Sequence, residues 1–127
     1  MTKSTIPTAT ELAILQVLWT HGPLTVRDVH ERLANDEQIG YTSVLKMLQV
    51  MFKKGLVKRD ESQRSHVYRS ARPAEQTQRG LIRNLVDKAF SGSATDLVVR
   101  ALATKKLTPD EIETMRALID QKAREND

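Results

Sequence analysis

Four polar side chains recur between residues 42 and 54 at spacings that place them on one face of a helix. They are Thr42, Lys46, Gln49 and Lys53. At about 100° per residue they fall about 140° to 200° away from Val44, which lies on the apolar side. Each of the four can donate a hydrogen bond and none is acidic. This donor stripe therefore suits phosphate oxygens and the acceptor-rich edges of bases.

Individual roles follow from the residue types in this helix. Lys46 and Lys53 can reach guanine edges or phosphates, whereas Thr42 and Gln49 can read base edges, Gln49 being able to pair with adenine. Ser43, at the start of the helix, suits a phosphate, since free backbone amides at that end favour an anion.

The opposite side of the helix predicted over residues 42–54 is expected to face a core. Its apolar members are Val44, Leu48, Met51 and Phe52, flanked by Leu45 and Met47. Gly55 follows directly and suits the left-handed position that ends a helix. The pattern predicts a helix with one buried side and one side open to a partner.

Two helices are predicted before this one. Thr8–Glu11 has the pattern of a capping box, and Gly22 with Pro23 ends the first helix. Thr25 is the expected N-cap of the second helix, which ends at Asn35–Asp36. In the first helix, apolar side chains recur at helical spacing at Leu12, Leu15, Leu18 and Trp19, and Trp19 is expected in the core. The buried stripe of the second helix is expected to be Val26, Val29 and Leu33.

A β-hairpin is predicted after the third helix. Leu56–Arg59 and His66–Arg69 are short β-like runs on either side of a polar turn. The order helix, helix, helix, hairpin predicts a winged-helix domain over residues 1–73, in which the second and third helices form a helix-turn-helix pair and the hairpin is the wing. Further contacts with a nucleic-acid backbone are expected from Lys54, Arg64, Ser65 and His66.

The distribution of charge supports a nucleic-acid partner. The chain of 127 residues has a net charge of +4. Residues 11–40 hold two basic and five acidic side chains, whereas residues 41–72 hold eight basic and two acidic ones. A basic run is often only a solvated surface. Here it coincides with the donor stripe and the hairpin, so we predict that the third helix enters the major groove of double-stranded DNA.

Three further helices are predicted over residues 74–127. They begin near Ala74, at Ser93 and at Thr108, where Thr108–Glu111 forms a second capping box with proline at the first helical position. They hold more apolar side chains than three short helices can bury in one chain, which favours a homodimer; the alternative is that they pack back onto the winged helix as a single domain. The residues expected at the dimer interface are Leu81, Leu85, Phe90, Leu97, Val98, Leu102, Ile112, Met115, Leu118 and Ile119.

Other classes of function find little support in the composition. The chain has no cysteine, which excludes disulfides, thiolate metal sites and cysteine nucleophiles. His21, His30 and His66 have no ligand-like spacing, and no phosphate loop, serine elbow or dinucleotide motif occurs, so we expect no metal, no cofactor and no enzyme activity. No apolar stretch is long enough to span a membrane, and residues 1–4 hold no apolar signal core, so we expect a cytoplasmic protein.

Several segments, in their order and spacing, make the chain similar to the penicillinase-repressor (BlaI/MecI) family. The resemblance extends from about Thr8 to Gln121. It rests on Ala13–Trp19, Gly22–Val29, Tyr41–Leu48, Lys54–Val57, Asp96–Val98 and Leu107–Glu113.

The resemblance implies a homodimeric bacterial repressor that binds a pseudo-palindromic operator, often of β-lactamase or related genes. In the antibiotic-responsive branch, a membrane sensor-protease triggers a cut between Asn and Phe in the dimerisation domain. This chain departs from that pattern, because Arg100–Ala101 stands at the matching place. A copper-responsive branch binds metal through C-terminal cysteines, which this chain lacks.

A function of another class stays open from the residues themselves. A winged helix can act as a protein–protein adaptor and bind its partner through the same exposed helix. Such a helix more often exposes apolar anchors than a basic stripe. An adaptor would also show no salt-dependent affinity for DNA.

Overall fold

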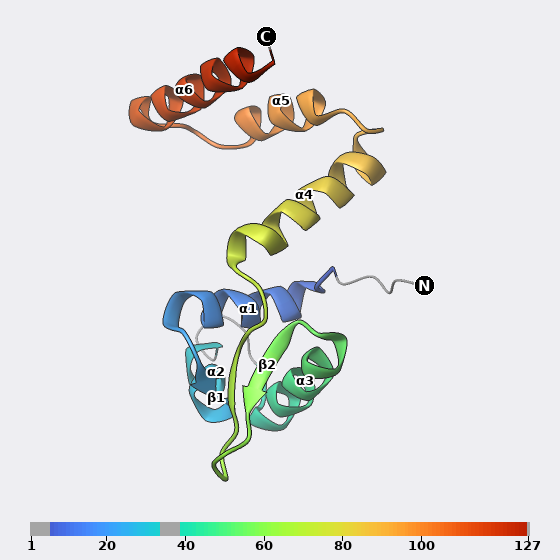
Figure 1. The fold of residues 1–127 in the computed structure, drawn as a ribbon, viewed down its shortest axis with the longest axis vertical. Coiled ribbons are helices and arrows are strands. Elements are labelled where there is room, and N and C mark those ends of the chain that lie inside the picture. The colour runs from blue at the N-terminus through green and yellow to red at the C-terminus, as the bar shows by residue number, and fades with distance from the viewer. Residues whose placement is uncertain (1–5, 34–38, 127) are drawn as a thin grey trace. The chain divides into compact units, whose positions relative to one another are not determined.

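A computed structural model describes residues 6–33 and 39–126 (Figure 1). The chain divides into two compact units, one up to Ile82 and one from Arg83 onwards. The division falls inside helix α4 (Ala74–Ala89). The domain boundary between residues 73 and 74 stays a prediction.

The first unit begins with the predicted capping box. The Thr8 hydroxyl accepts a hydrogen bond from the Glu11 amide at 3.2 Å, and the Thr8 amide donates to Glu11 Oε1 at 2.9 Å. These bonds satisfy donors that a helix start leaves open. Helix α1 (Ala9–His21) follows and ends at Gly22, whose φ of 84° suits glycine.

The next two helices form the predicted helix-turn-helix pair. Helix α2 (Val26–Leu33) starts after Thr25, whose hydroxyl accepts from the Asp28 amide at 3.2 Å, as expected of an N-cap. Its predicted end at Asn35–Asp36 lies outside the described residues. Helix α3 (Tyr41–Lys54) begins one residue before the predicted start and ends at Gly55, which is left-handed with φ 82°.

A three-stranded antiparallel sheet completes this unit, with strand order β1-β3-β2. Strands β2 (Val57–Asp60) and β3 (Val67–Ser70) form the predicted hairpin, each shifted by one residue from the predicted bounds. Strand β1 (Leu24–Thr25) was not predicted, because two residues show no alternation; it pairs Thr25 with Val67. The fold is therefore mostly helical with a small sheet, in the arrangement of a winged helix.

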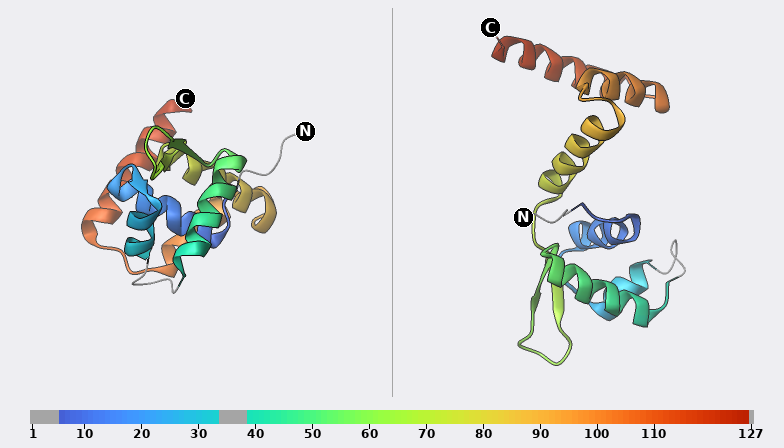
Figure 2. Two further views of the ribbon diagram at one scale, coloured as in Figure 1. Left: turned by 90° about the horizontal axis from the view of Figure 1, so that it is seen from below. Right: turned by 90° about the vertical axis from the view of Figure 1, so that its right-hand side faces the viewer.

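The buried side chains of the first unit form one core that joins all three helices to the hairpin. The ribbon of these elements is seen from two further sides in Figure 2. This core is almost wholly aliphatic, with Tyr68 as its aromatic member. The predicted core residues Val44, Leu48 and Met51 of α3 are fully buried. The buried apolar residues are Ile14, Leu15, Leu18, Val26, Val29, Leu33, Val44, Leu48, Met51, Leu56, Val57 and Tyr68.

Two aromatic side chains differ from the predicted core positions. Phe52 is 36% exposed, because it lies at the margin of the apolar side of α3, and the Arg59 guanidinium covers its ring at 4.0 Å from the centroid. Trp19 is partly buried against the core. Its Nε1–H donates to Ser70 Oγ at 2.8 Å and to the Arg72 carbonyl at 3.3 Å, which ties α1 to the end of β3.

The C-terminal helices are α4, α5 (Ala94–Thr104) and α6 (Pro109–Glu125). Positive φ angles at Ser91 and Gly92 end α4 close to the predicted break. The Ser93 hydroxyl accepts from the Asp96 amide at 3.0 Å, and Thr108 and Glu111 form the predicted second capping box. The starts of α5 and α6 are thus set by local side-chain bonds.

No residue of α4, α5 or α6, all of which the structure describes, is buried. Of the predicted interface residues, Leu81, Phe90, Leu97 and Met115 are half-buried. The exposed ones are Leu85, Val98, Leu102, Ile112, Leu118 and Ile119, the last at 62%. These helices thus present apolar side chains that the chain itself does not cover.

In the described parts of the chain, none of the helices combines the length and the apolar character that crossing a bilayer requires.

Candidate nucleic-acid interface

The donor stripe lies on the solvent side of α3, opposite the buried Val44, Leu48 and Met51. All four of its side chains are exposed, as is Ser43. None of them makes a side-chain hydrogen bond or an ion pair with any residue that the structure describes. The stripe therefore offers donors that no described residue of the protein occupies.

The wing extends beyond the helices of its unit in the side views of Figures 1 and 2. Its turn is braced by local bonds: Asp60 Oδ1 accepts from the Ser62 amide at 2.9 Å, and Arg59 pairs with Glu61 at 2.5 Å. The Ser62 amide holds the pKa of Asp60 below its ordinary value. Arg64 and Ser65 are exposed in this hairpin and make no side-chain bond within the described residues.

A hollow of about 340 Å³ lies between α3, the start of α2 and the wing. Each of the three segments contributes three residues to its wall. The lining residues are Thr25, Val26, Arg27, Tyr41, Leu45, Gln49, Arg64, Ser65 and His66. Pairing of Thr25 with Val67 brings the wing residues just before β3 beside the start of α2.

The hollow unites only part of the predicted site. Gln49, Arg64, Ser65 and His66 meet there, whereas the other predicted residues of α3 do not line it. The sequence analysis did not assign the other five lining residues to the site; they are Thr25, Val26, Arg27, Tyr41 and Leu45. One signal was available, because Tyr41, Leu45 and Gln49 are spaced at i, i+4 and i+8 and so form a line along the flank of one helix.

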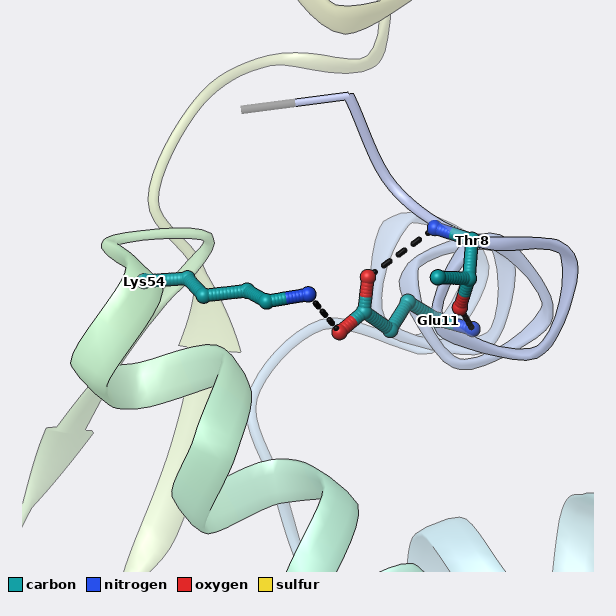
Figure 3. Close-up of polar contacts among 3 residues, drawn as sticks. All are labelled: Thr8, Glu11 and Lys54. Atoms are coloured by element: carbon teal, nitrogen blue, oxygen red, sulfur yellow. Dashed lines mark hydrogen bonds and ion pairs between the residues drawn. The ribbon is translucent and has the colours of Figure 1, made fainter. Parts of the chain in front are cut away.

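Lys54 has a partner inside the domain (Figure 3). Its Nζ lies 2.8 Å from Glu11 Oε2, and Glu11 is the one buried charged residue in the described part of the chain. Burial raises the pKa of Glu11, but bonds from Lys54 and Thr8 outweigh it, so the pKa lies below its ordinary value. A DNA contact by Lys54 stays a prediction, and this amine also fixes the end of α3 to the start of α1.

Metal-ligating side chains do not gather in the described residues in any group of three or more. The site consists instead of amide, hydroxyl, guanidinium and ammonium donors. Such donors bind phosphates and base edges.

The sequence profile of the penicillinase repressors matches residues 7–121. The chain belongs to the penicillinase repressor family. A relative, the transcriptional regulator BlaI of Mycobacterium tuberculosis, is 32% identical over 108 residues, which are 84% of this chain and 77% of that protein. The methicillin resistance regulatory protein MecI of Staphylococcus aureus is 19% identical over 112 residues, 88% of this chain and 91% of MecI.

A solved structure agrees with the fold of the first unit. The DNA-binding domain of the repressor BlaI superimposes with a TM-score of 0.51 at 23% identity, covering 58% of this chain and 90% of that domain. Members of the penicillinase repressor family are transcriptional repressors that bind DNA. The chain is accordingly a DNA-binding transcriptional repressor and not an enzyme.

Proposed function

We propose that the chain binds a pseudo-palindromic operator as a homodimer and blocks transcription by occluding the promoter. The observation that carries this proposal is the donor stripe of α3, which is exposed and free of partners in the described part of the chain. A helix that only needed solubility would hold acidic residues as readily as basic ones, and this stripe holds none. The wing adds a second set of cationic and hydroxyl donors.

Each half-site is read by Thr42, Lys46 and Gln49 in the major groove. Ser43, Lys53 and Lys54 hold phosphates from α3. Arg64, Ser65 and His66 hold them from the wing. The phosphate contacts set the orientation of the domain on the duplex, and the base contacts set the sequence it prefers.

The homodimer forms through α4, α5 and α6. This assignment is supported by the ten predicted interface residues, none of which is buried within the chain. A second copy would remove their apolar surface from water, which drives association. Two recognition helices then sit about one turn of DNA apart, near 34 Å.

Loss of the dimer releases the operator, because each half holds only one half-site. A membrane sensor-protease is the partner that the family implies for this step. Both residues of Arg100–Ala101 are exposed in α5, so a cut there would act directly on the helices assigned to the dimer. We place the repressor in the bacterial cytoplasm, with β-lactamase or other stress-resistance genes as targets.

The test is selection from a library of randomised duplexes with the full chain near physiological salt. We expect enrichment of an inverted repeat whose half-sites lie one helical turn apart. A dimer with about eight phosphate contacts should lose affinity with a slope of log K against log salt near −7.

Enrichment of a single half-site would contradict the dimeric part of the proposal. A salt slope near zero without enrichment would contradict DNA recognition itself. That result would favour the protein–protein adaptor.

A further inference from the structure

The predicted DNA contacts assign no role to the hollow between α3, the start of α2 and the wing. Its wall carries two guanidinium groups, Arg27 and Arg64, and the hydroxyl of Tyr41. Among the residues that the structure describes, none with an acidic side chain lines it. A concave surface with this composition attracts an anion.

The donors of the hollow are available to a ligand. Arg64 makes no side-chain bond in the described residues, and the Tyr41 hydroxyl makes none either. Arg27 is 81% exposed, and its pairing with Glu31 is long, at 3.9 Å. The His30 ring contacts the Tyr41 ring edge-on, with 6.0 Å between the centroids. This contact holds the Tyr41 ring between α2 and α3.

The place of the hollow follows from the geometry of a duplex. The major and minor grooves are separated by one sugar–phosphate strand, so a protein with a helix in one groove and a wing towards the other must straddle that strand. The hollow lies between those two elements. With α3 in the major groove, as proposed above, the hollow is the part of the domain that faces this strand.

We propose that the hollow seats the sugar–phosphate strand between the two grooves, with Arg27 and Tyr41 as further DNA-contacting residues. Arg27, from the start of α2, and Arg64, from the wing, bind phosphates on opposite sides of the hollow. The Tyr41 hydroxyl donates a hydrogen bond to a phosphate oxygen. Gln49, which lies on both the stripe and the wall, reads a base beside that strand. This inference rests on the proposed function and adds to it the path of the backbone.

The test compares full-length variants on a duplex of arbitrary sequence, long enough for two half-sites, by fluorescence anisotropy over a series of salt concentrations. Arg27→Ala should weaken binding about three- to tenfold. It should also reduce the salt slope by about one per protomer bound. Tyr41→Phe should weaken binding by a similar factor and leave the slope unchanged, because no charge is lost.

Two matched variants separate position from charge. Arg32→Ala removes the same charge from another exposed position of α2, but Arg32 does not line the hollow. The DNA affinity and salt slope of this variant should therefore stay close to those of the unmodified protein. Arg27→Lys keeps the charge and should restore the slope.

The contact is then located on the selected operator by replacing single phosphates with neutral methylphosphonates. Replacement of one particular phosphate should weaken operator binding by the unmodified protein. The same replacement should not weaken binding by Arg27→Ala any further. If Arg27→Ala and Arg32→Ala have the same DNA affinity and salt slope, while the unmodified protein keeps a steep slope, the hollow does not bind the sugar–phosphate strand. That result would leave the proposed function unaffected. A flat slope for the unmodified protein would overturn both the role of the hollow and the proposed function.

Discussion

Glu11 and Lys54 connect the start of α1 to the end of the recognition helix through a single carboxylate. Removal of the amine in Lys54→Met leaves a buried acceptor without its strongest partner. The free energy of unfolding should fall by about 1–3 kcal/mol, measured by urea denaturation. Lys53→Met, at the neighbouring exposed position without a partner in the described residues, should change it little.

The Glu11 carboxylate also makes the stability of the domain depend on pH. The folded-state pKa of Glu11 lies below its ordinary value of 4.5. The ionised Glu11 carboxylate therefore makes its full contribution to the free energy of unfolding above pH 4.5. This contribution is lost as the pH falls through the pKa of Glu11 in the folded state. Lys54→Met should raise the pKa of Glu11 and weaken this dependence, which NMR titration of the Glu11 carboxyl can follow. An unchanged titration would contradict the pairing.

Lys46 and Arg64 separate base reading from backbone binding. Lys46→Ala should relax the sequence preference by about 1–3 kcal/mol at one base position, whereas Arg64→Ala should weaken binding to all sequences alike and lower the salt slope by about one per protomer. Competition assays with operator and random duplexes measure both effects. Equal losses on the two duplexes from both variants would show that the roles are assigned wrongly.

At the scale of elements, the contact of Arg59 with the Phe52 ring fixes the wing to α3. Phe52→Leu keeps an apolar side chain but removes the ring face that attracts the guanidinium. We expect faster amide hydrogen exchange in β2 and β3 and an affinity for DNA lower by about two- to threefold, because the wing must then be ordered on binding. Val50→Ala, at another exposed apolar position of α3, is the control.

Local signals account for what the sequence predicted well. Both capping boxes, the glycine ends of α1 and α3 and the buried face of α3 depend on residues within one or two turns of each other. Strand β1 was not predicted, because a strand of two residues is too short to show an alternation of apolar and polar side chains. Phe52 was wrongly predicted in the core, because it lies at the margin of the apolar face of α3.

Contacts between distant segments account for what was missed. The Glu11–Lys54 pair spans 43 residues, and the bond from Trp19 to Ser70 spans 51. The hollow needs the pairing of β1 with β3, which brings the wing beside the start of α2. Spacing along the chain indicates which face a residue occupies, but not which distant element lies opposite that face.

At the scale of the whole molecule, the uncovered apolar side chains of α4, α5 and α6 lead to a prediction about assembly. A charge at an apolar interface position should oppose association, because it would have to leave water. Leu118→Glu is therefore expected to shift the protein from dimer to monomer in sedimentation equilibrium and to weaken operator binding by more than tenfold.

The control for this variant is Gln121→Glu, which adds the same charge at a polar position of α6. It should leave both the sedimentation and the DNA affinity nearly unchanged. A dimer that persists in Leu118→Glu would exclude Leu118 from the interface and place the contact elsewhere.

The position of Trp19 makes the chain its own optical reporter. It is the sole tryptophan, and Tyr41 and Tyr68 are the only tyrosines, so tryptophan and tyrosine emission comes from the first unit alone. Far-ultraviolet circular dichroism also reports the helices of the second unit. Since Trp19 binds Ser70 and Arg72, its emission follows the release of β3 from α1. If the second unit folds only on association, the dichroism transition will move with protein concentration, while the Trp19 transition will not.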